Sequence, residues 1–270
     1  MIEKIVSIII VSYNAKELLQ RCIESIENNV KINHEVIIVD NDSEKETTDY
    51  LKEKEGSCKV IFNNKNVGFS RANNIGARIA KGDILHFLNP DTLVDETINE
   101  LYRKVMRNDK GIAYATTLNE NGHKISGGHL LPIFKNIVYS FTKHDLFRWY
   151  IGASLIFYKD DFIKVGRWNE SYFMYSEDLD ICYKSYLNNV KIKEINSNII
   201  HLGGGSTRRW SNYEIDLKKE KAYISFFKNN HITINYFVFT FLSIFYNLFK
   251  YGEKNFSYRI KVILHALVSK

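Results

Sequence analysis

Asp91 is the residue with the clearest potential for chemistry, because it follows directly on an apolar strand. Residues 82–92 read GDILHFLNPDT, so the strand expected over 83–88 ends in Asn89-Pro90-Asp91. Pro90 fixes its own φ and restricts the residue before it, which sets the direction of the carboxylate. A carboxylate at the carboxyl edge of a parallel sheet suits a divalent cation that carries phosphate.

The same segment also fits an ordinary structural role. The apolar spacing indicates a helix over Asp95–Met106, and Asp91 or Thr92 would then serve as its N-cap, the more common role of an aspartate before a helix. The remaining polar residues decide between the two interpretations, since a metal site needs partners at the same edge.

A second acidic set stands at the start of a helix expected from Glu177 onward. Glu177, Asp178 and Asp180 favour a helix N-terminus through its dipole, and Asp180 can pair with Lys184 at i+4. Three acids so close repel one another, however, which is easier to understand where a substrate or cation gathers. Among neighbouring aromatic residues, one carboxylate with a raised pKa could accept a proton from a hydroxyl.

His201 precedes the glycine run Gly203–Gly205. A histidine at a strand end is usually an ordinary structural residue, and glycine runs are often only hinges. Together, a permissive loop and an imidazole can approach a phosphate or metal closely.

The elements that position these residues alternate regularly through the first 92 residues. Buried β-branched or apolar runs alternate with amphipathic stripes, which predicts a parallel, Rossmann-like sheet with right-handed crossovers. We expect strands over Ile5–Val11, Val36–Val39, Lys59–Phe62 and 83–88, and helices over Ala15–Asn28, 44–53 and Phe69–Ile79.

Polar clusters follow the first two strands, at the same edge as Asp91. The clusters contain Ser12, Tyr13 and Asn14, and then Asp40 and Asn41. Each residue alone could be a turn or cap residue, but several clusters at one edge favour a site for a base and ribose. The nucleotide fingerprints GxGxxG and GxxxxGKS or GxxxxGKT are absent.

The second half is less regular. Strands are expected over Gly111–Leu118, Ile151–Tyr158, Val190–Ile195 and Asn198–Leu202, with a glycine-rich loop or hairpin over Glu120–His129. We divide the chain into residues 1–92, a nucleotide-binding half, residues 93–227, the second half of the same domain, and residues 228–270, C-terminal helices.

Composition limits the class of protein. A chain of 270 residues with 45% hydrophobic content can bury a full α/β core. Its three cysteines are far apart and unpatterned, which indicates reduced thiols in a cytosolic protein. No signal-peptide pattern precedes the first strand.

The C-terminal residues indicate a membrane surface. Most of the net charge of +6 lies after residue 249, and Ile232–Phe249 contains no charged residue. The 18 residues reach the lower limit for a membrane span, but polar residues interrupt them. We favour interfacial helices at the inner face of the cell membrane over a span, with packing on the protein's own core as the alternative.

The ordered motifs carry a resemblance. They are VSIIIVSYN (6–14), VIIVDNDS (36–43), NVGFSRANNIGARIAKGDILHFLNPDT (66–92) and GRWNESYFMYSEDLDICYK (166–184), followed by HLGGGS. Over residues 5–207 the chain resembles family 2 glycosyltransferases of the GT-A fold, and is similar to their bacterial rhamnosyltransferase-like branch. The resemblance implies an α/β GT-A fold and a hexosyltransferase-type enzyme of surface polysaccharide synthesis.

The resemblance also implies roles for individual residues. The family's DxD metal motif falls on Asn89-Pro90-Asp91, with Asn in place of the first Asp, so Asp91 would bind Mn²⁺ or Mg²⁺ and His201 would contact the metal or the diphosphate. The ED motif falls on Glu177-Asp178, which makes Asp178 the expected general base. The positions expected to contact the donor are Ser12, Tyr13, Asn14, Asp40, Asn41, Asn73, Asn74 and Asn89.

The implied reaction is an inverting transfer from a UDP- or dTDP-linked sugar to a glycan acceptor. Rhamnose is one option for the sugar, and a lipid-linked glycan is one option for the acceptor. A sugar nucleotidyltransferase would usually need a basic, glycine-rich loop near the N-terminus, where residues 11–17 offer only Lys16. A membrane-tethered nucleotide-binding module without catalysis leaves Glu177-Asp178 unexplained. No motif supports nucleic-acid binding.

Overall fold

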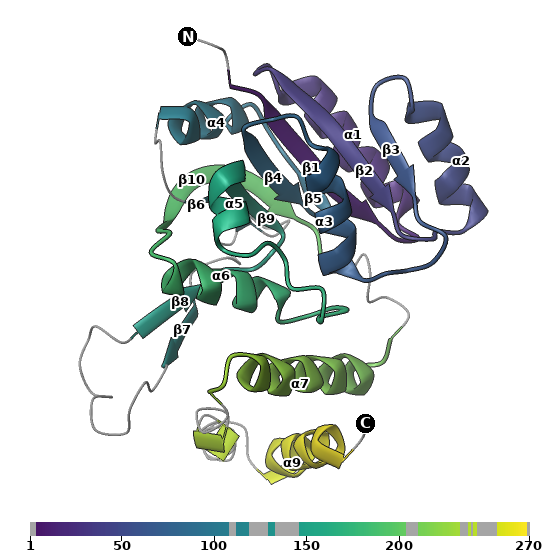
Figure 1. Cartoon of the computed structure of the whole chain (residues 1–270). Helices are drawn as coiled ribbons and strands as arrows, with labels where there is room; N and C mark the ends of the chain where they lie inside the picture. The colour runs from purple at the N-terminus through teal and green to yellow at the C-terminus, as the bar shows by residue number, and fades with distance from the viewer. Residues whose placement is uncertain are drawn as a thin grey trace. The chain divides into compact units, whose positions relative to one another are not determined.

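The computed structural model describes residues 4–107, 112–118, 129–132, 146–203, 210–232, 237–238, 240–241 and 253–268 (Figure 1). The chain forms two compact units. Unit 1 comprises residues 1–129, 149–173 and 177–208, and unit 2 comprises residues 130–148, 174–176 and 209–270.

Unit 1 is built on an eight-stranded sheet of order β3-β2-β1-β4-β9-β6-β10-β5. Its strands are β1 (Val6–Ser12), β2 (His34–Asp40), β3 (Lys59–Phe62), β4 (Ile84–Leu88), β5 (Thr92–Leu93), β6 (Ile112–Leu118), β9 (Ser154–Tyr158) and β10 (Ile192–His201). Strands β7 (His129–Pro132) and β8 (Leu146–Trp149) form a separate two-stranded sheet.

The helices of unit 1 are α1 (Lys16–Asn29), α2 (Lys45–Lys54), α3 (Phe69–Ile79), α4 (Ile98–Arg107), α5 (Lys159–Lys164) and α6 (Glu177–Leu187). The predicted βα alternation of the first 92 residues is confirmed. Helix α5 was not expected, and the two strands predicted over 190–195 and 198–202 are one strand, β10, with an irregularity in its register between Ile195 and Ile199. A register irregularity of this kind interrupts the pairing of a strand locally without ending it.

Strand direction brings the polar clusters to one edge. β1 lies between β2 and β4 and is parallel to both, with Ser12 opposite Asp40 and Ile10 opposite Leu88. The segments that follow these three strands therefore emerge at the same carboxyl edge. β9 then joins the sheet antiparallel to β4 and to β6. Because β2 is also parallel to β3, and β6 to β10, the sheet is mostly parallel.

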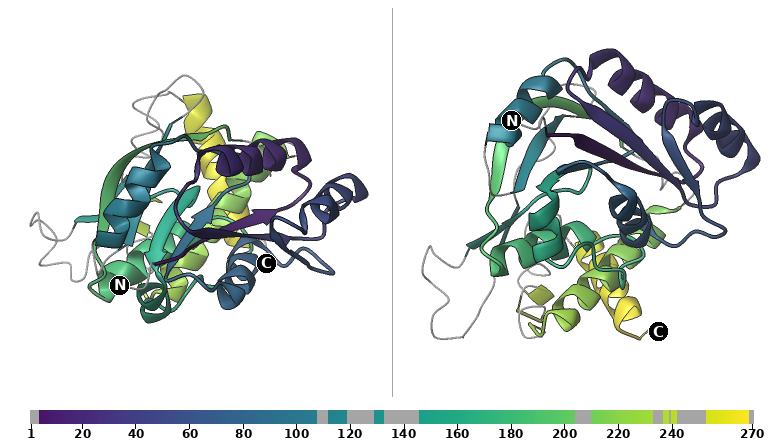
Figure 2. Two further views of the ribbon diagram at one scale, coloured as in Figure 1. Left: turned by 90° about the horizontal axis from the view of Figure 1, so that it is seen from above. Right: turned by 45° about the horizontal axis from the view of Figure 1, so that its top comes forward.

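Helices cover both faces of this sheet (Figure 2). On one face, Ile8 and Ile10 of β1 pack in a core with Leu19 of α1 and Leu101 of α4. On the other face, Phe87 of β4 contacts aromatic rings of α5 and of the segment after it, Phe162 at 4.9 Å and Trp168 at 5.3 Å between centroids. Side chains on the two faces of the central strands thus pack in two different cores, as expected for strands that are buried on both faces. The three cysteines, Cys22, Cys58 and Cys182, are free and buried.

His86 is an ionisable group inside this sheet, and its burial makes stability depend on pH. Its Nδ1 lies 2.7 Å from the Tyr102 hydroxyl and its Nε2 lies 2.9 Å from Ser154 Oγ. Burial lowers the pKa of His86 from 6.5 to about 3. Between these two values the unfolded chain binds a proton that the folded protein does not, so acidification favours unfolding.

We therefore expect the free energy of unfolding to fall by up to about 1.4 kcal/mol per pH unit from this group as the pH drops below 6.5. Denaturant titrations of wild type and His86→Gln at several pH values from 4.5 to 8 isolate the term as the difference between the two proteins. The variant is less stable at neutral pH, and the gap narrows on acidification. A gap that stays constant over this range would contradict the assignment.

Unit 2 contains two long helices, α7 (Asn212–Asn229) and α9 (Glu253–Val268). Helix α7 begins with a capping box in which Ser211 and Glu214 satisfy each other's backbone N–H groups. The two helices are joined by an ion pair of 2.6 Å between Arg259 and Glu220, and by a 2.9 Å hydrogen bond from the Tyr258 hydroxyl to Asp216.

Most of the predicted membrane segment, 232–249, lies outside the described residues. Among the residues that are described, no helix is long and apolar enough to cross a bilayer. The exposed apolar side chains of unit 2 include Phe237, Phe241, Leu264, Leu267 and Val268. Interfacial association stays a prediction, which co-sedimentation with anionic vesicles tests.

Candidate active site

Backbone contacts on both sides of Asp91 fix its position in the turn after β4. The backbone N–H of Asn89 donates to Ala153 O at 2.9 Å, and Thr92 in β5 lies opposite His201 in β10. The backbone N–H of Leu202 then donates to Asp91 O at 2.9 Å. The expectation that Asp91 or Thr92 caps a helix is wrong, because β5 intervenes and α4 begins only at Ile98.

Asp91 and His201 meet although 110 residues separate them. His201 Nε2 lies 3.1 Å from Asp91 Oδ1, and the two side chains are only 16% and 8% exposed. Two residues earlier, Asn89 Oδ1 is buried and has no hydrogen-bond partner in the described parts of the chain.

These oxygen and nitrogen donors fit Mn²⁺ or Mg²⁺ chemically. They also leave coordination positions for phosphate oxygens and water. Within the described residues no group of three or more His, Cys, Asp or Glu side chains is arranged to hold a metal ion.

The acid pair is tied to the same edge through Gly152. Asp178 Oδ2 accepts the backbone N–H of Gly152 at 3.1 Å, and Oδ1 accepts that of Leu179 at 2.8 Å. A Cβ at position 152 would lie 3.2 Å from Asp178 Cβ, so the two residues are in close contact and Asp178 would have to shift slightly to admit a side chain there. Since Gly152 precedes Ala153, which holds Asn89, a short run of contacts joins Asp178 to the turn that carries Asp91.

Burial raises the pKa values of the carboxyl groups of both Glu177 and Asp178. Both residues keep part of their surface exposed, but their carboxyl groups are largely surrounded by protein. Burial, with the adjacent Asp178 carboxylate as a second cause, raises the pKa of Glu177 to about 8. Burial also raises the pKa of Asp178 to about 6, against the opposing effect of its two backbone hydrogen bonds. Near pH 7 the raised pKa values favour a pair that shares one proton, the higher value being that of Glu177, so one carboxylate of the pair can accept another proton.

The backbone immediately before the acid pair is strained. Tyr175 and Ser176 have φ values of 70° and 63°, which non-glycine residues rarely adopt. Such conformations cost about 1–3 kcal/mol each and persist where the surroundings hold them, typically at functional sites. In the helix that follows, Asp180 pairs with Lys184 at 2.8 Å, as its i+4 spacing predicted.

The polar residues that follow β1 and β2 divide into two groups. Ser12 Oγ and Asp40 Oδ1 are buried and have no hydrogen-bond partner within the described residues. Tyr13 is 38% exposed. Asn14, by contrast, accepts the backbone N–H of Glu44 at 2.7 Å and so holds the start of α2.

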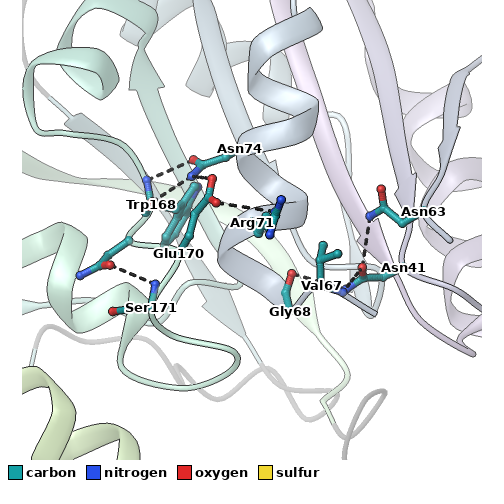
Figure 3. Close-up of polar contacts among 10 residues, drawn as sticks. Asn41, Asn63, Val67, Gly68, Arg71, Asn74, Trp168, Glu170 and Ser171 are labelled. Atoms are coloured by element: carbon teal, nitrogen blue, oxygen red, sulfur yellow. Dashed lines mark hydrogen bonds and ion pairs between the residues drawn. The ribbon is translucent and has the colours of Figure 1, made fainter. Parts of the chain in front are cut away.

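Asn41 and Asn74 have side chains that bond within the protein (Figure 3). Asn41 accepts the Asn63 side chain at 3.2 Å and the Val67 backbone at 3.0 Å, and donates to Gly68 O at 3.4 Å. It therefore shapes the loop between β3 and α3, a role that its position after a strand did not reveal.

Asn74 makes two opposed hydrogen bonds with the backbone of Trp168, of 2.9 Å and 3.2 Å, on the other side of α3. Asn73 donates to Phe69 O, one turn earlier in the same helix, at 3.1 Å. The side-chain amides of these asparagines position the protein's own segments. Direct contact of Asn14, Asn41, Asn73 and Asn74 with a donor stays a prediction.

Comparison with known proteins identifies the family. The model of the family described as "Glycosyl transferase family 2" matches residues 7–166, which contain the carboxyl edge of β1, β2 and β4, and also Asp91 and Gly152. The chain belongs to glycosyl transferase family 2. The resemblance read from the motifs is thereby confirmed.

Three relatives show the range of this family 2 chain's similarity. It is 26% identical over 202 residues to the low-salt glycan biosynthesis hexosyltransferase Agl10 of Haloferax volcanii, covering 69% of this chain and 63% of Agl10. It is 26% identical over 215 residues to the rhamnosyltransferase WbbL of Escherichia coli strain K12, covering 69% and 79%. Over 89 residues it is 37% identical to the Escherichia coli UDP-Glc:alpha-D-GlcNAc-diphosphoundecaprenol beta-1,3-glucosyltransferase WfaP, covering 33% and 36%. The chain thus spans less than two thirds of Agl10 and of WfaP.

Solved structures support the fold. The structure of GalNAc-T7 with UDP, GalNAc and Mn²⁺ matches with a TM-score of 0.62 at 18% identity, over 84% of this chain and 48% of that protein. At this identity the match establishes the GT-A-like α/β fold, with its mostly parallel sheet flanked by helices.

Proposed function

We propose that this protein is an inverting, metal-dependent glycosyltransferase that moves a sugar from a nucleoside-diphosphate sugar to a hydroxyl group of a glycan acceptor. The observation that carries the proposal is the run of short contacts from His201 and Asp91, through Asn89 and the Gly152 segment, to Asp178. It supports a site in which two metal ligands and a base lie at one edge of the sheet.

The donor would lie along the carboxyl edge of β1, β2 and β4. Two oxygens would hydrogen-bond the nucleoside, Ser12 Oγ and Asp40 Oδ1. Both are buried and have no partner in the described chain. Asp91 and His201 would hold Mn²⁺ or Mg²⁺ on the diphosphate, with Asn89 as a further polar contact. When bound, the metal would neutralise the charge of the diphosphate leaving group.

Asp178 would act on the acceptor. Its carboxylate removes the proton of the acceptor hydroxyl while that oxygen bonds to the anomeric carbon and the bond from this carbon to the diphosphate oxygen breaks. A single displacement inverts the configuration, whereas retention by double displacement would require a second carboxylate acting as nucleophile. Glu177, protonated at neutral pH, would donate a hydrogen bond within the site.

The relatives indicate the class of substrates. WfaP is named for a UDP-glucose donor and a diphosphoundecaprenol-linked acceptor, and WbbL for rhamnosyl transfer. We propose a UDP- or dTDP-linked hexose or rhamnose as donor and a lipid-linked glycan as acceptor, in the synthesis of a bacterial surface polysaccharide.

A panel of nucleotide-sugars tests the proposal. Purified protein with Mn²⁺ is incubated with UDP-glucose, UDP-galactose, UDP-GlcNAc and dTDP-rhamnose, with and without GlcNAc-diphosphate carried on a short alkyl chain. We expect one donor to release its nucleoside diphosphate, with stimulation by the acceptor and by Mn²⁺. Tight nucleotide-sugar binding without turnover would instead favour a binding module, and release of pyrophosphate from a sugar phosphate and a nucleoside triphosphate would favour a nucleotidyltransferase.

A further inference from the structure

An exposed aromatic ring, that of Phe173, lies in the segment that leads to the acid pair. Phe173 is 51% exposed, whereas Trp168 and Tyr172 in the same segment are 2% and 3% exposed. Resting on the function proposed above, we propose that the ring of Phe173 is a stacking platform for a sugar ring at the transfer site.

The backbone of Phe173 is fixed by the start of α3. Phe69, the first residue of that helix, donates its N–H to Phe173 O at 2.9 Å. Gly68 has a φ of +84°, and a Cβ there would lie 2.7 Å from Phe173 O and 2.9 Å from Phe173 Cα. Only glycine permits both the left-handed conformation and this close approach. Phe173 is therefore held in position although its ring is open to solvent.

The neighbours of Phe173 tie it to both halves of the site. Gly68 accepts a hydrogen bond from Asn41 (Figure 3). Asn41 follows Asp40, the last residue of β2, so this bond connects Gly68 to the carboxyl edge of the sheet. Tyr172 donates its hydroxyl hydrogen bond to Asp180 at 3.3 Å, two residues beyond Asp178 in α6. Hydrogen bonds thus connect the segment that carries Phe173 both to the start of α3, which Asn41 contacts, and to α6, which carries the proposed base.

The segment that precedes Phe173 is anchored at a second point. The backbone of Trp168 is bonded to Asn74 in both directions (Figure 3). The Trp168 ring also meets that of Phe69 at 5.7 Å between centroids. A ring held on a rigid segment loses little conformational freedom when a ligand covers it.

The chemistry of the ring suits the proposed substrates. One face of a pyranose ring presents C–H groups, and an aromatic face buries such a surface while leaving the hydroxyl groups for polar contacts. Since the ring could serve the transferred sugar or the acceptor sugar, the experiment has one arm for each.

We test the proposal with Phe173→Leu, which keeps an apolar side chain without an aromatic face, and Phe173→Tyr, which keeps the face. In the acceptor arm, KM is measured for GlcNAc-diphosphate on a short alkyl chain, with the donor that the panel identifies. In the donor arm, calorimetry with Mn²⁺ compares the binding of UDP with that of UDP-glucose. Tyr186→Leu, at an aromatic residue of α6 that is 38% exposed, is the matched control.

We expect Phe173→Leu to raise the acceptor KM, or to weaken UDP-glucose but not UDP, by about fivefold to tenfold, which is the contribution of one aromatic contact. Phe173→Tyr should stay within about twofold of wild type, and so should the control. The affected arm identifies which sugar stacks. If the wild type transfers sugar but Phe173→Leu matches it in both arms, the stacking inference is wrong. If the wild type transfers no sugar from the panel, the proposed function fails and this inference fails with it.

Discussion

Replacing Asp178 with asparagine is expected to reduce sugar transfer by about 1,000-fold or more, while the affinity for the nucleotide-sugar stays within about twofold of wild type. General-base catalysis contributes about 100- to 10,000-fold, and an amide cannot accept the proton of the acceptor hydroxyl. The side-chain oxygen of asparagine can still accept the backbone N–H of Gly152 or Leu179, so the protein should fold. The measurement is kcat for transfer beside donor binding by calorimetry.

Glu177→Gln is the matched control for this change. Because burial raises the pKa of Glu177 to about 8, its carboxyl group is mostly protonated at pH 7, and glutamine reproduces the neutral form. We expect Glu177→Gln to keep transfer at pH 7 within about fivefold of wild type, since the base itself is retained. Equal, severe losses in both variants would show that the pair acts as a unit and would contradict the separate roles proposed here.

The same prediction has a pH signature. Asp178 works as a base only when deprotonated, and burial raises its pKa to about 6. In wild type, kcat should therefore fall on the acid side of about pH 6 and level off above it. The residual activity of Asp178→Asn should lack this limb. A wild-type profile whose acid limb lies near pH 4, the ordinary range of a carboxyl group, would show that Asp178 is not the titrating base.

The residues that mark the edge of the sheet were predictable because their signals are local. A β-branched run such as Ile5–Val11 must be buried on both faces, and polar residues that follow several parallel strands must meet at one edge. The sequence thus places Ser12, Asp40 and Asp91 together without knowledge of the strand order. Their shared edge, and the ordered motifs that imply the family, needed no tertiary information.

The remaining parts of the site depend on contacts between distant segments. The pairing of β5 with β10 puts His201 against Asp91, yet β5 has only two residues and carries no periodicity. Gly152 lay inside a predicted strand, although its N–H is taken by Asp178 and the strand begins only at Ser154. A glycine before an apolar strand was a signal for such a close approach, but nothing in the sequence names its partner.

Replacing Asp91 with asparagine is expected to weaken Mn²⁺ binding, measured with UDP present, by at least about 100-fold, because the change removes the only negative charge of the proposed ligand pair. Loss of a partner that merely supports a metal ligand already costs about 10- to 100-fold, so loss of the ligand charge should cost at least as much. Transfer at limiting Mn²⁺ should fall in parallel. The direct measurement is a Mn²⁺ titration followed by electron paramagnetic resonance.

Stability separates this role from a structural one. Asparagine at position 91 can still accept a hydrogen bond from His201 Nε2, and the backbone contact with Leu202 does not involve the side chain. The free energy of unfolding should therefore change by no more than about 1 kcal/mol. Asp95→Asn is the control, since Asp95 lies four residues further on and accepts the Thr97 N–H at 2.9 Å outside the proposed metal site. If Asp91→Asn binds Mn²⁺ as wild type does but unfolds more easily, the contact between Asp91 and His201 only joins β5 to β10, and the metal must be held elsewhere.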